Sequence, residues 1–341
     1  MTIALILLLL LHCFSLIKGK SGDCSPFDLK HTLPLRGILA LLVVFGHLDT
    51  VVSGQTKVLM PLHMATPAVA VFFFMSGYGL MSSYLQKGKL YLNRFVTKSA
   101  IKLLLPLFIT TVLYQVILFF IGDFSMDRII DGYITGKEAP LMHSWYVYAL
   151  FVFYLIYYLA FHKDRSQSTV EKCLVITFLI IIYYIITRYV FGWDFFWWIT
   201  CLAFPMGFFY KQYEDSIKDI IKQHYWIPIP IVVIVLIIKM LSGEEVLLLS
   251  EIPYLLIGPL VAVLLYRLPL PTNSVILNFL GTISFEIYLT HGAFEVLFKD
   301  VFASPYLYII AVVTFTVLFS WVLHNVYHKM TSKLLSRLNN E

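Results

Sequence analysis

The chain has 341 residues, of which 60% are hydrophobic and only 13% charged, and its formal net charge at pH 7 is +5. A soluble domain carries about 25% charged residues, so a soluble globule of this size would lack polar surface, and that class is excluded. Aromatic residues reach 16%, which suits helices that pack together and are anchored at lipid interfaces.

Long apolar runs follow one another along the chain. A helix needs about 20 mainly apolar residues to span a bilayer, and its backbone must satisfy its own hydrogen bonds there, which predicts a helix in every run. The predicted fold class is therefore all-α: a polytopic integral membrane protein with about ten core transmembrane helices plus one N-terminal hydrophobic segment. The runs lie at about residues 3–17, 35–52, 66–85, 100–121, 142–161, 173–191, 193–210, 225–241, 246–266, 274–298 and 304–327.

The first run, at residues 3–17, is short for a span and has two interpretations. One is a cleaved signal peptide, but the opening letters MTIA include no basic residue and no clear small-x-small cleavage site follows. We favour the other, a retained extra helix whose N-terminus lies outside. The chain then divides into an N-terminal hydrophobic segment at 1–26, a membrane domain at 27–330 and a cytoplasmic tail at 331–341.

The basic residues predict the orientation of the chain. If the run at 35–52 crosses outward from the cytoplasm and later runs alternate, 19 of the 25 lysines and arginines fall in cytoplasmic segments. Because cytoplasmic loops are enriched in these residues, we expect a plasma or inner membrane protein with a cytoplasmic C-terminus. This uneven distribution also argues against a nucleic-acid partner. The six basic residues on the outer side are Lys57, Arg128, Lys137, Arg188, Lys239 and Lys299.

A cation and an imidazole share one face of the run at 35–52. Arg36 lies at its cytoplasmic edge, and His47 follows 11 residues later in its apolar interior. At 3.6 residues per turn this spacing returns to nearly the same face, about 16 Å along the axis. An ionisable residue inside a span indicates function by default, and the pair suits a long anionic ligand with a cytoplasmic charged end. The alternative is an arginine that reaches the interface and a structural histidine.

Arg94, Lys98 and Lys102 recur every fourth residue and share a helix face. Such a ladder is typical of phosphate binding. The alternative is an ordinary cytoplasmic anchor of the helix that follows.

Two aromatic segments supply candidate substrate contacts. Ser76 and Tyr78 lie in a span whose glycines favour close helix packing and could also admit a ligand to the backbone. Trp145 and Tyr148 open the run at 142–161 at the outer interface, where such residues more often anchor a helix than bind a ligand.

The run at 274–298 carries a further polar face. Ser284, Tyr288 and His291 are spaced to share one side of a helix, and Glu286 is an acid well inside the span. We predict that His291 contributes to catalysis and that Glu286 and Tyr288 contact substrate. The alternative is a buried hydrogen-bond network that holds helices together. The four cysteines form no CxxC and no metal-ligand spacing, so no metal site is predicted.

Taken in order, these segments resemble the acyltransferase 3 family of bacterial membrane O-acyltransferases over about residues 27–330. Each segment is weakly specific alone, but their order across the predicted spans is specific. The segments are Arg36 to His47, Phe73-Phe74-Met75-Ser76-Gly77-Tyr78, the ladder from Arg94 to Pro106, Trp145-Tyr146, Phe204-Pro205-Met206-Gly207 and Ile287-Tyr288-Leu289-Thr290-His291.

The resemblance implies transfer of an acyl group, usually acetyl, from cytoplasmic acetyl-CoA to hydroxyls of an extracytoplasmic or lipid-linked glycan. It implies a direct catalytic role for His47, since a neutral imidazole suits a general base. It also implies roles near the CoA for Arg36, Arg94 and Lys98. Some relatives carry a fused extracytoplasmic domain that completes transfer, so we expect this chain to act alone or with a separate transferase partner.

The chain departs from the family pattern in two places. The N-terminal run lies before the usual start, and Glu286 stands where a less acidic residue is expected. Glu286 either pairs with His291 or a neighbouring helix, or marks a divergent acceptor. Two other functions share this topology: a transporter or flippase of an envelope polysaccharide precursor, and a non-catalytic scaffold. No internal repeat typical of transporters is found, and a scaffold has no need of Arg36 and His47 on one face.

Overall fold

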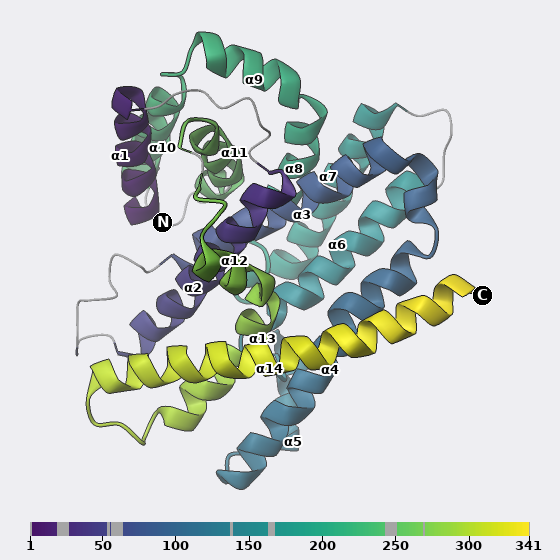
Figure 1. Cartoon of the computed structure of the whole chain (residues 1–341), viewed down its shortest axis with the longest axis vertical. Coiled ribbons are helices and arrows are strands. Elements are labelled where there is room, and N and C mark those ends of the chain that lie inside the picture. The colour runs from purple at the N-terminus through teal and green to yellow at the C-terminus, as the bar shows by residue number, and fades with distance from the viewer. Residues whose placement is uncertain are drawn as a thin grey trace.

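The structure, a computed structural model, describes residues 2–18, 27–52, 55, 64–136, 139–162, 168–242, 251–268 and 270–340. Every regular element in these residues is a helix, which confirms the predicted all-α class (Figure 1). The elements are α1 (Thr2–Lys18), α2 (Leu29–Val51), α3 (Ala65–Lys87), η2 (Gly88–Leu92), α4 (Phe95–Phe120), α5 (Met126–Thr135), α6 (Trp145–His162), α7 (Thr169–Ile185), η3 (Ile186–Val190), η4 (Phe195–Trp197), α8 (Ala203–Gln212), α9 (Glu214–Gln223), α10 (Pro228–Ser242), α11 (Ile252–Arg267), α12 (Val275–Thr282), α13 (Ser284–Phe298) and α14 (Pro305–Asn340).

The described residues do not confirm the predicted number of spanning helices. Among the described residues, six helices are long and apolar enough to cross a membrane. A seventh is obtained if α9 and α10, which meet at a 98° bend, count as one broken span. The predicted count of ten is therefore not confirmed. The six are Lys30–Val51, Ala65–Leu92, Phe95–Phe120, Trp145–His162, Thr169–Val190 and Pro305–Leu338.

Short helices and breaks inside apolar runs account for the difference. The helices α10 and α11 have only 15 and 16 residues. The run at 274–298 divides at Ile283 into α12 and α13, and the run at 193–210 holds only the short η4 and the ten-residue α8. Hydropathy averaged along a run does not detect such breaks, because each run as a whole stays apolar. Broken backbone is tolerated at membrane depth where protein surrounds it.

Two glycines allow α3 and α8 to cross closely. A Cβ added at Gly77 would collide with the carbonyl oxygen of Phe204, and one at Gly207 would collide with that of Phe74. This is the close packing that the glycines predict. The crossing matters for the site, because α3 also contacts α2 and α11 and forms walls of the cavities described below.

The N-terminal run forms α1, which packs against α10 and α11 at one edge of the molecule (Figure 1). The His12 ring donates a hydrogen bond from Nε2 to the carbonyl oxygen of Leu260, at 3.2 Å. The 17-residue α1 is not among the six long apolar helices. Retention of this segment therefore stays a prediction.

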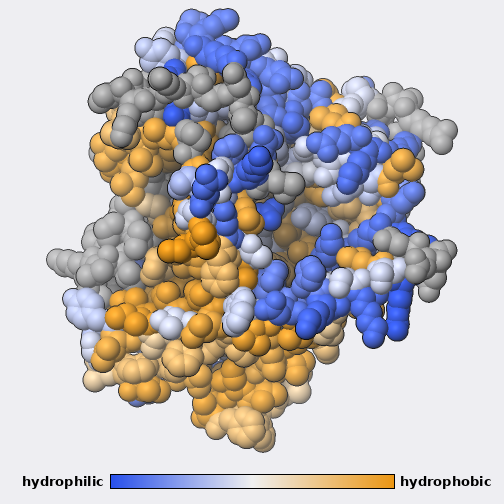
Figure 2. Space-filling view, in the orientation of Figure 1, coloured by the Kyte–Doolittle hydropathy of each residue, from blue (hydrophilic) through white to orange (hydrophobic). Residues whose placement is uncertain are grey.

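The surface is divided between hydrophilic and hydrophobic regions. In Figure 2 hydrophilic residues gather over α9 and the C-terminal end of α14, and hydrophobic residues cover α5 and the first part of α14. Large apolar side chains are also exposed along α4 and α14, among them Phe108, Phe119 and Leu318. An apolar surface of this kind is expected to face lipid.

Candidate active site

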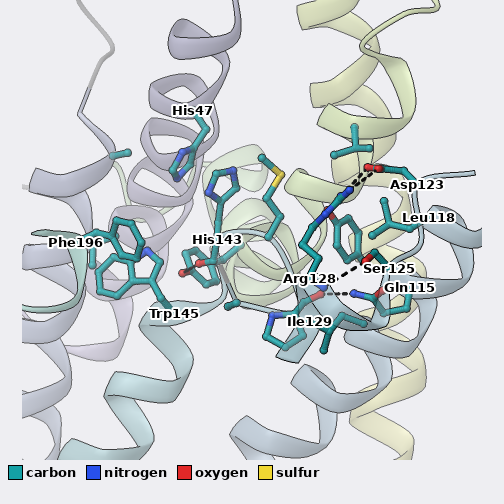
Figure 3. Close-up of a pocket in the computed structure, with 18 of the residues that line it drawn as sticks. His47, Gln115, Leu118, Asp123, Ser125, Arg128, Ile129, His143, Trp145 and Phe196 are labelled. Atoms are coloured by element: carbon teal, nitrogen blue, oxygen red, sulfur yellow. Dashed lines mark hydrogen bonds and ion pairs between the residues drawn. The ribbon is translucent and has the colours of Figure 1, made fainter. Parts of the chain in front are cut away.

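Three histidines from distant parts of the sequence meet in one place. His47 lies in the last turn of α2, His143 in the loop before α6, and His291 in the middle of α13. The ring centroids of His47 and His143 are 3.7 Å apart, and the His291 centroid is 5.3 Å and 5.0 Å from them. His47 thus lies close to the C-terminal end of α2, four residues before Val51. Figure 3 shows the facing rings of His47 and His143.

His143 is held by its own backbone. Its φ is +64°, in the left-handed region that side chains rarely adopt, and the hydroxyl of Tyr288 donates a hydrogen bond to its carbonyl oxygen. Gly292 gives the loop room, because a Cβ there would lie 2.9 Å from Cβ of Met142. The strained loop is therefore fixed against α13, where the imidazole reaches the other two histidines.

Glu295 is a buried acid one turn after His291. Its side chain accepts a hydrogen bond at Oε2 from Nε2 of His143, at 3.2 Å, and its Oε1 lies 4.0 Å from Nε2 of His291. Only 3% of Glu295 is exposed. The Nε2–H of His143 donates this hydrogen bond, so the neutral ring has its lone pair at Nδ1. The tautomer is assigned from the hydrogen bond to Glu295.

His291 is fixed in the opposite tautomer. Its Nδ1 lies 3.2 Å from the carbonyl oxygen of Ile287, and since a carbonyl only accepts, Nδ1 carries the proton. The lone pair is therefore at Nε2, a fully buried atom that finds no hydrogen-bond partner among the described residues. His291 lies against the other two rings without lining the cavity that they face.

A cavity of about 430 Å³, here called the histidine cavity, opens beside His47 and His143. Trp145 and Phe196 form one wall (Figure 3). The opposite wall carries Arg128, which makes a two-point hydrogen-bonded pair with Asp123 at 2.9 and 3.1 Å. The bond to Arg128 lowers the pKa of the exposed Asp123, so this carboxylate is charged at neutral pH. The cavity combines a flat aromatic wall, a polar wall and an imidazole floor.

A second cavity, here called the Arg36 cavity, measures about 370 Å³. Its lining includes Arg36, Ser76, Ser284 and Tyr288. Tyr288 also lines the histidine cavity, so this one side chain forms the partition between the two.

A third cavity of about 440 Å³, here called the basic cavity, lies beyond the Arg36 cavity. Lys87, Lys98 and Lys102 give it its charge. Arg94, the remaining member of the predicted ladder, is exposed just before α4 and does not line it. The basic cavity shares with the Arg36 cavity the wall residues Leu80, Tyr91, Leu103 and Tyr154. The three cavities therefore follow one another from the lysines to the histidine cluster.

Two of the predicted substrate contacts lie elsewhere. The hydroxyl of Tyr78 donates to the carboxylate of Glu214 at 2.9 Å, in a buried group where Lys211 also reaches Glu214 at 2.5 Å. Tyr148 is 3.2 Å from the hydroxyl of Tyr133 and lines a separate apolar groove. The structure thus places both residues outside the row of three cavities.

Glu286 takes one of the alternatives left open by the sequence. Its Oε1 lies 3.0 Å from Nδ1 of His324 on α14, which makes the neighbouring helix its partner. The acid that lies beside His291 is instead Glu295.

Sequence reasoning missed His143 and Glu295, and each had a signal. Glu295 is an acid four residues after His291 in the same apolar run, which the rule on intramembrane ionisable residues would have selected. His143 lies two residues before the Trp145-Tyr146 segment, at the start of the run at 142–161, where an ionisable residue is a signal of function. Gln115 and Arg128 carry no such signal, because only the fold brings α4 and α5 to the cavity.

Comparison with known proteins gives one match. A family model described as an acyltransferase domain matches residues 35–325, a range that contains all three histidines and all three cavities. No curated protein and no solved structure matches the chain.

Proposed function

Because the chain belongs to the acyltransferase 3 family over residues 35–325, we propose that it is a multi-pass membrane O-acyltransferase that uses His47 as its base. The donor is a cytoplasmic acyl-CoA, in the simplest case acetyl-CoA, and the acceptor is a hydroxyl of an extracytoplasmic or lipid-linked glycan. The observation that carries the proposal is the row of three cavities that leads from a basic opening to the histidine cluster.

The donor fits the basic and Arg36 cavities. Coenzyme A has phosphates at one end and a thioester at the end of a long thin arm. The phosphates meet Lys98 and Lys102, as charge-assisted hydrogen bonds to phosphate favour. The arm then follows the Arg36 cavity towards Tyr288. From Lys98 to Tyr114, which lines the histidine cavity, α4 rises by about 24 Å, a distance that suits a long extended ligand.

The acceptor fits the histidine cavity. A sugar ring has an apolar face and a polar rim, and the cavity offers the aromatic Trp145 and Phe196 opposite the polar Arg128 and Gln115. Binding sites of this size use apolar walls for affinity and a few polar groups for orientation. Arg128 is already paired with Asp123, so the wall presents both charges and favours a hydroxylated sugar over a strongly anionic one.

The reaction follows from this placement. A neutral imidazole of His47 takes the proton of the acceptor hydroxyl while its oxygen attacks the thioester carbonyl. The tetrahedral intermediate then expels the CoA thiolate, which receives the proton, and the products are an O-acyl ester and CoA. His143 and Glu295 act beside His47 as positioning residues. The carboxylate of Glu295 fixes the ring of His143, and that ring stacks on the ring of His47. The proposed reaction consumes acyl-CoA and requires no metal.

The orientation supports this division of substrates. The basic cavity is built from the end of α3 and the start of α4, which lie on the side that the positive-inside rule assigns to the cytoplasm. The histidine cavity is built from the opposite ends of the same helices. We therefore place the enzyme in the plasma or inner membrane, with the donor inside, the acceptor outside and the C-terminus in the cytoplasm.

Mass spectrometry of surface glycans tests the proposal in cells. Cells that contain the gene should carry O-acyl groups that are absent when the gene is deleted. A copy encoding His47→Gln should leave them absent, although the variant protein reaches the membrane in normal amounts. Identical glycans in all three strains would refute the proposed function.

A further inference from the structure

The histidine cluster has the donor set of a metal site as well as that of a base. We propose that His47, His143 and His291 bind a Zn²⁺ ion, and that the bound ion inhibits acyl transfer. The three residues each offer one nitrogen, and these atoms lie within 4.8 Å of one another. The binding half of this inference is independent of the proposed function, whereas the inhibition half rests on it.

The hydrogen bonds behind the rings are those of metal-ligating histidines. Such histidines usually donate their second N–H to a carboxylate or a backbone carbonyl, which fixes the tautomer and aims the lone pair. His143 donates from Nε2 to Glu295, and His291 donates from Nδ1 to the carbonyl of Ile287. The lone pair of His143 is therefore at Nδ1 and that of His291 is at Nε2. Both side chains are buried or half-buried.

Two polar atoms in this cluster remain without a hydrogen-bond partner among the described residues. They are Nε2 of His291 and Oε1 of Glu295, which lie 4.0 Å apart. A buried acceptor without a partner is unfavourable, and two acceptors this close together favour a positive charge beside them. A metal ion bound by the three histidines gives Nε2 of His291 a partner, and the nearby negative charge of Glu295 offsets part of the charge of the ion.

The ligand types select the metal. Imidazole nitrogens suit Zn²⁺ and other transition metals, whereas Mg²⁺ and Ca²⁺ prefer oxygen ligands. Tetrahedral zinc with bonds of about 2.0–2.1 Å places its nitrogen ligands about 3.3 Å apart, so the cluster must contract on binding. His47, near the end of α2, is the member best placed to move, while the loop of His143 is held against α13 and His291 lies inside that helix. Their stacked rings face the histidine cavity, from which an ion can enter.

Inhibition follows because the Zn²⁺ ion and the acceptor proton would compete for the same lone pair of His47. A nitrogen of His47 that binds Zn²⁺ cannot take the proton of an acceptor hydroxyl. The ion would also occupy the floor of the cavity in which that hydroxyl must arrive. Protons compete with metal for imidazole, so Zn²⁺ should inhibit less at pH 6 than at pH 7.5.

Equilibrium dialysis tests the binding half without any activity measurement. The full-length protein, purified in detergent and stripped with a chelator, should take up one Zn²⁺ per chain. His291→Gln and Glu295→Gln should weaken uptake by about 10- to 100-fold, as changes to ligands and their partners do. His12→Gln and His328→Gln, which alter histidines outside the cluster, are the matched controls. Zinc uptake that is absent, or that is unchanged in His291→Gln, would overturn the site.

A spectroscopic measurement on the unaltered protein covers variants that fail to fold. X-ray absorption of the Zn²⁺-loaded protein should show about three nitrogen ligands near 2.0–2.1 Å. A first shell made only of oxygen ligands would refute the assignment. An activity measurement tests the inhibition half. Zn²⁺ should abolish acyl transfer, a chelator should restore it, and Mg²⁺ at the same concentration should have no effect. Zinc that binds at the cluster but stimulates transfer would overturn the inhibition half alone. A protein without transferase activity in any condition would refute the proposed function, and the dialysis result would still decide the site.

Discussion

His143 and Glu295 change the interpretation of His47, the proposed base. His47 alone is a histidine at the end of an apolar helix, but in the structure its ring is stacked on a second imidazole that a buried carboxylate orients. If His47 is the base, this pair holds its ring in position for proton transfer. Such positioning increases the reaction rate, because the ring need not be ordered during the reaction. We therefore expect residues that do not touch substrate to affect turnover.

Glu295→Gln tests this expectation. The amide is close in shape but loses the charge, so we expect kcat to fall by about 10- to 100-fold, which is less than the 10²–10⁴-fold of a lost general base. KM for acetyl-CoA should stay unchanged. Steady-state kinetics on purified protein separates the two parameters. Glu286→Gln is the matched control, because that acid pairs with His324 instead. A rise in KM with unchanged kcat would assign Glu295 to donor binding.

Arg36 and the lysines of the basic cavity should act on the donor. Arg36→Ala and Lys98→Ala are expected to raise KM for acetyl-CoA, and Arg36→Lys should rescue only partly because an ammonium lacks the planar fork of a guanidinium. Binding of acetyl-CoA to the purified variants measures the effect directly.

Arg94→Ala belongs in the same series. The ladder predicts a weaker donor complex, whereas the exposed position of Arg94 outside the basic cavity favours a smaller effect than that of Lys98→Ala. Unchanged affinity in Arg36→Ala, Lys98→Ala and Arg94→Ala together would place the donor elsewhere.

At the scale of helices, the crossing of α3 and α8 is the contact most sensitive to side-chain size. Gly207→Ala places a methyl group against the backbone of α3, and overpacking of this kind typically costs about 1–3 kcal/mol. We expect a lower thermal unfolding midpoint in detergent. Gly79→Ala on the same α3 is the control, since a Cβ there meets nothing within 4 Å and its midpoint should not fall. An equal loss in both variants would show that helix glycines, and not this crossing, set the stability.

Apolar periodicity and length predict helices well, and they also place Arg36, Ser284 and Tyr288 along the helices that line the cavities. They do not predict where a helix breaks. The divide at Ile283 and the five-residue π-helix at Ile186–Val190 both lie inside runs that are apolar on average, so a count of apolar residues does not locate them. The sequence likewise does not predict that His143 lies in the site, because its position depends on a loop that is folded against α13.

For the whole molecule, the arrangement of the cavities requires a single orientation in the membrane. The loop at 86–99 and the C-terminus should both lie in the cytoplasm, because the basic residues gather there. Reporter fusions after Lys89 and at the C-terminus measure this in cells. Two extracytoplasmic signals would show the opposite orientation. The basic cavity would then face the side of the membrane that lacks coenzyme A.

Transfer across a sealed membrane is the most direct measurement. The purified protein is placed in vesicles, acetyl-CoA labelled in its acetyl group is supplied on the side of the basic cavity, and a glycan acceptor is supplied on the other side. We predict that label reaches the glycan and that thiol is released in equal amount, with a fall of about 10²–10⁴-fold for His47→Gln. Normal transfer by His47→Gln, or movement of glycan without thioester consumption, would contradict an acyltransferase that uses His47 as its base.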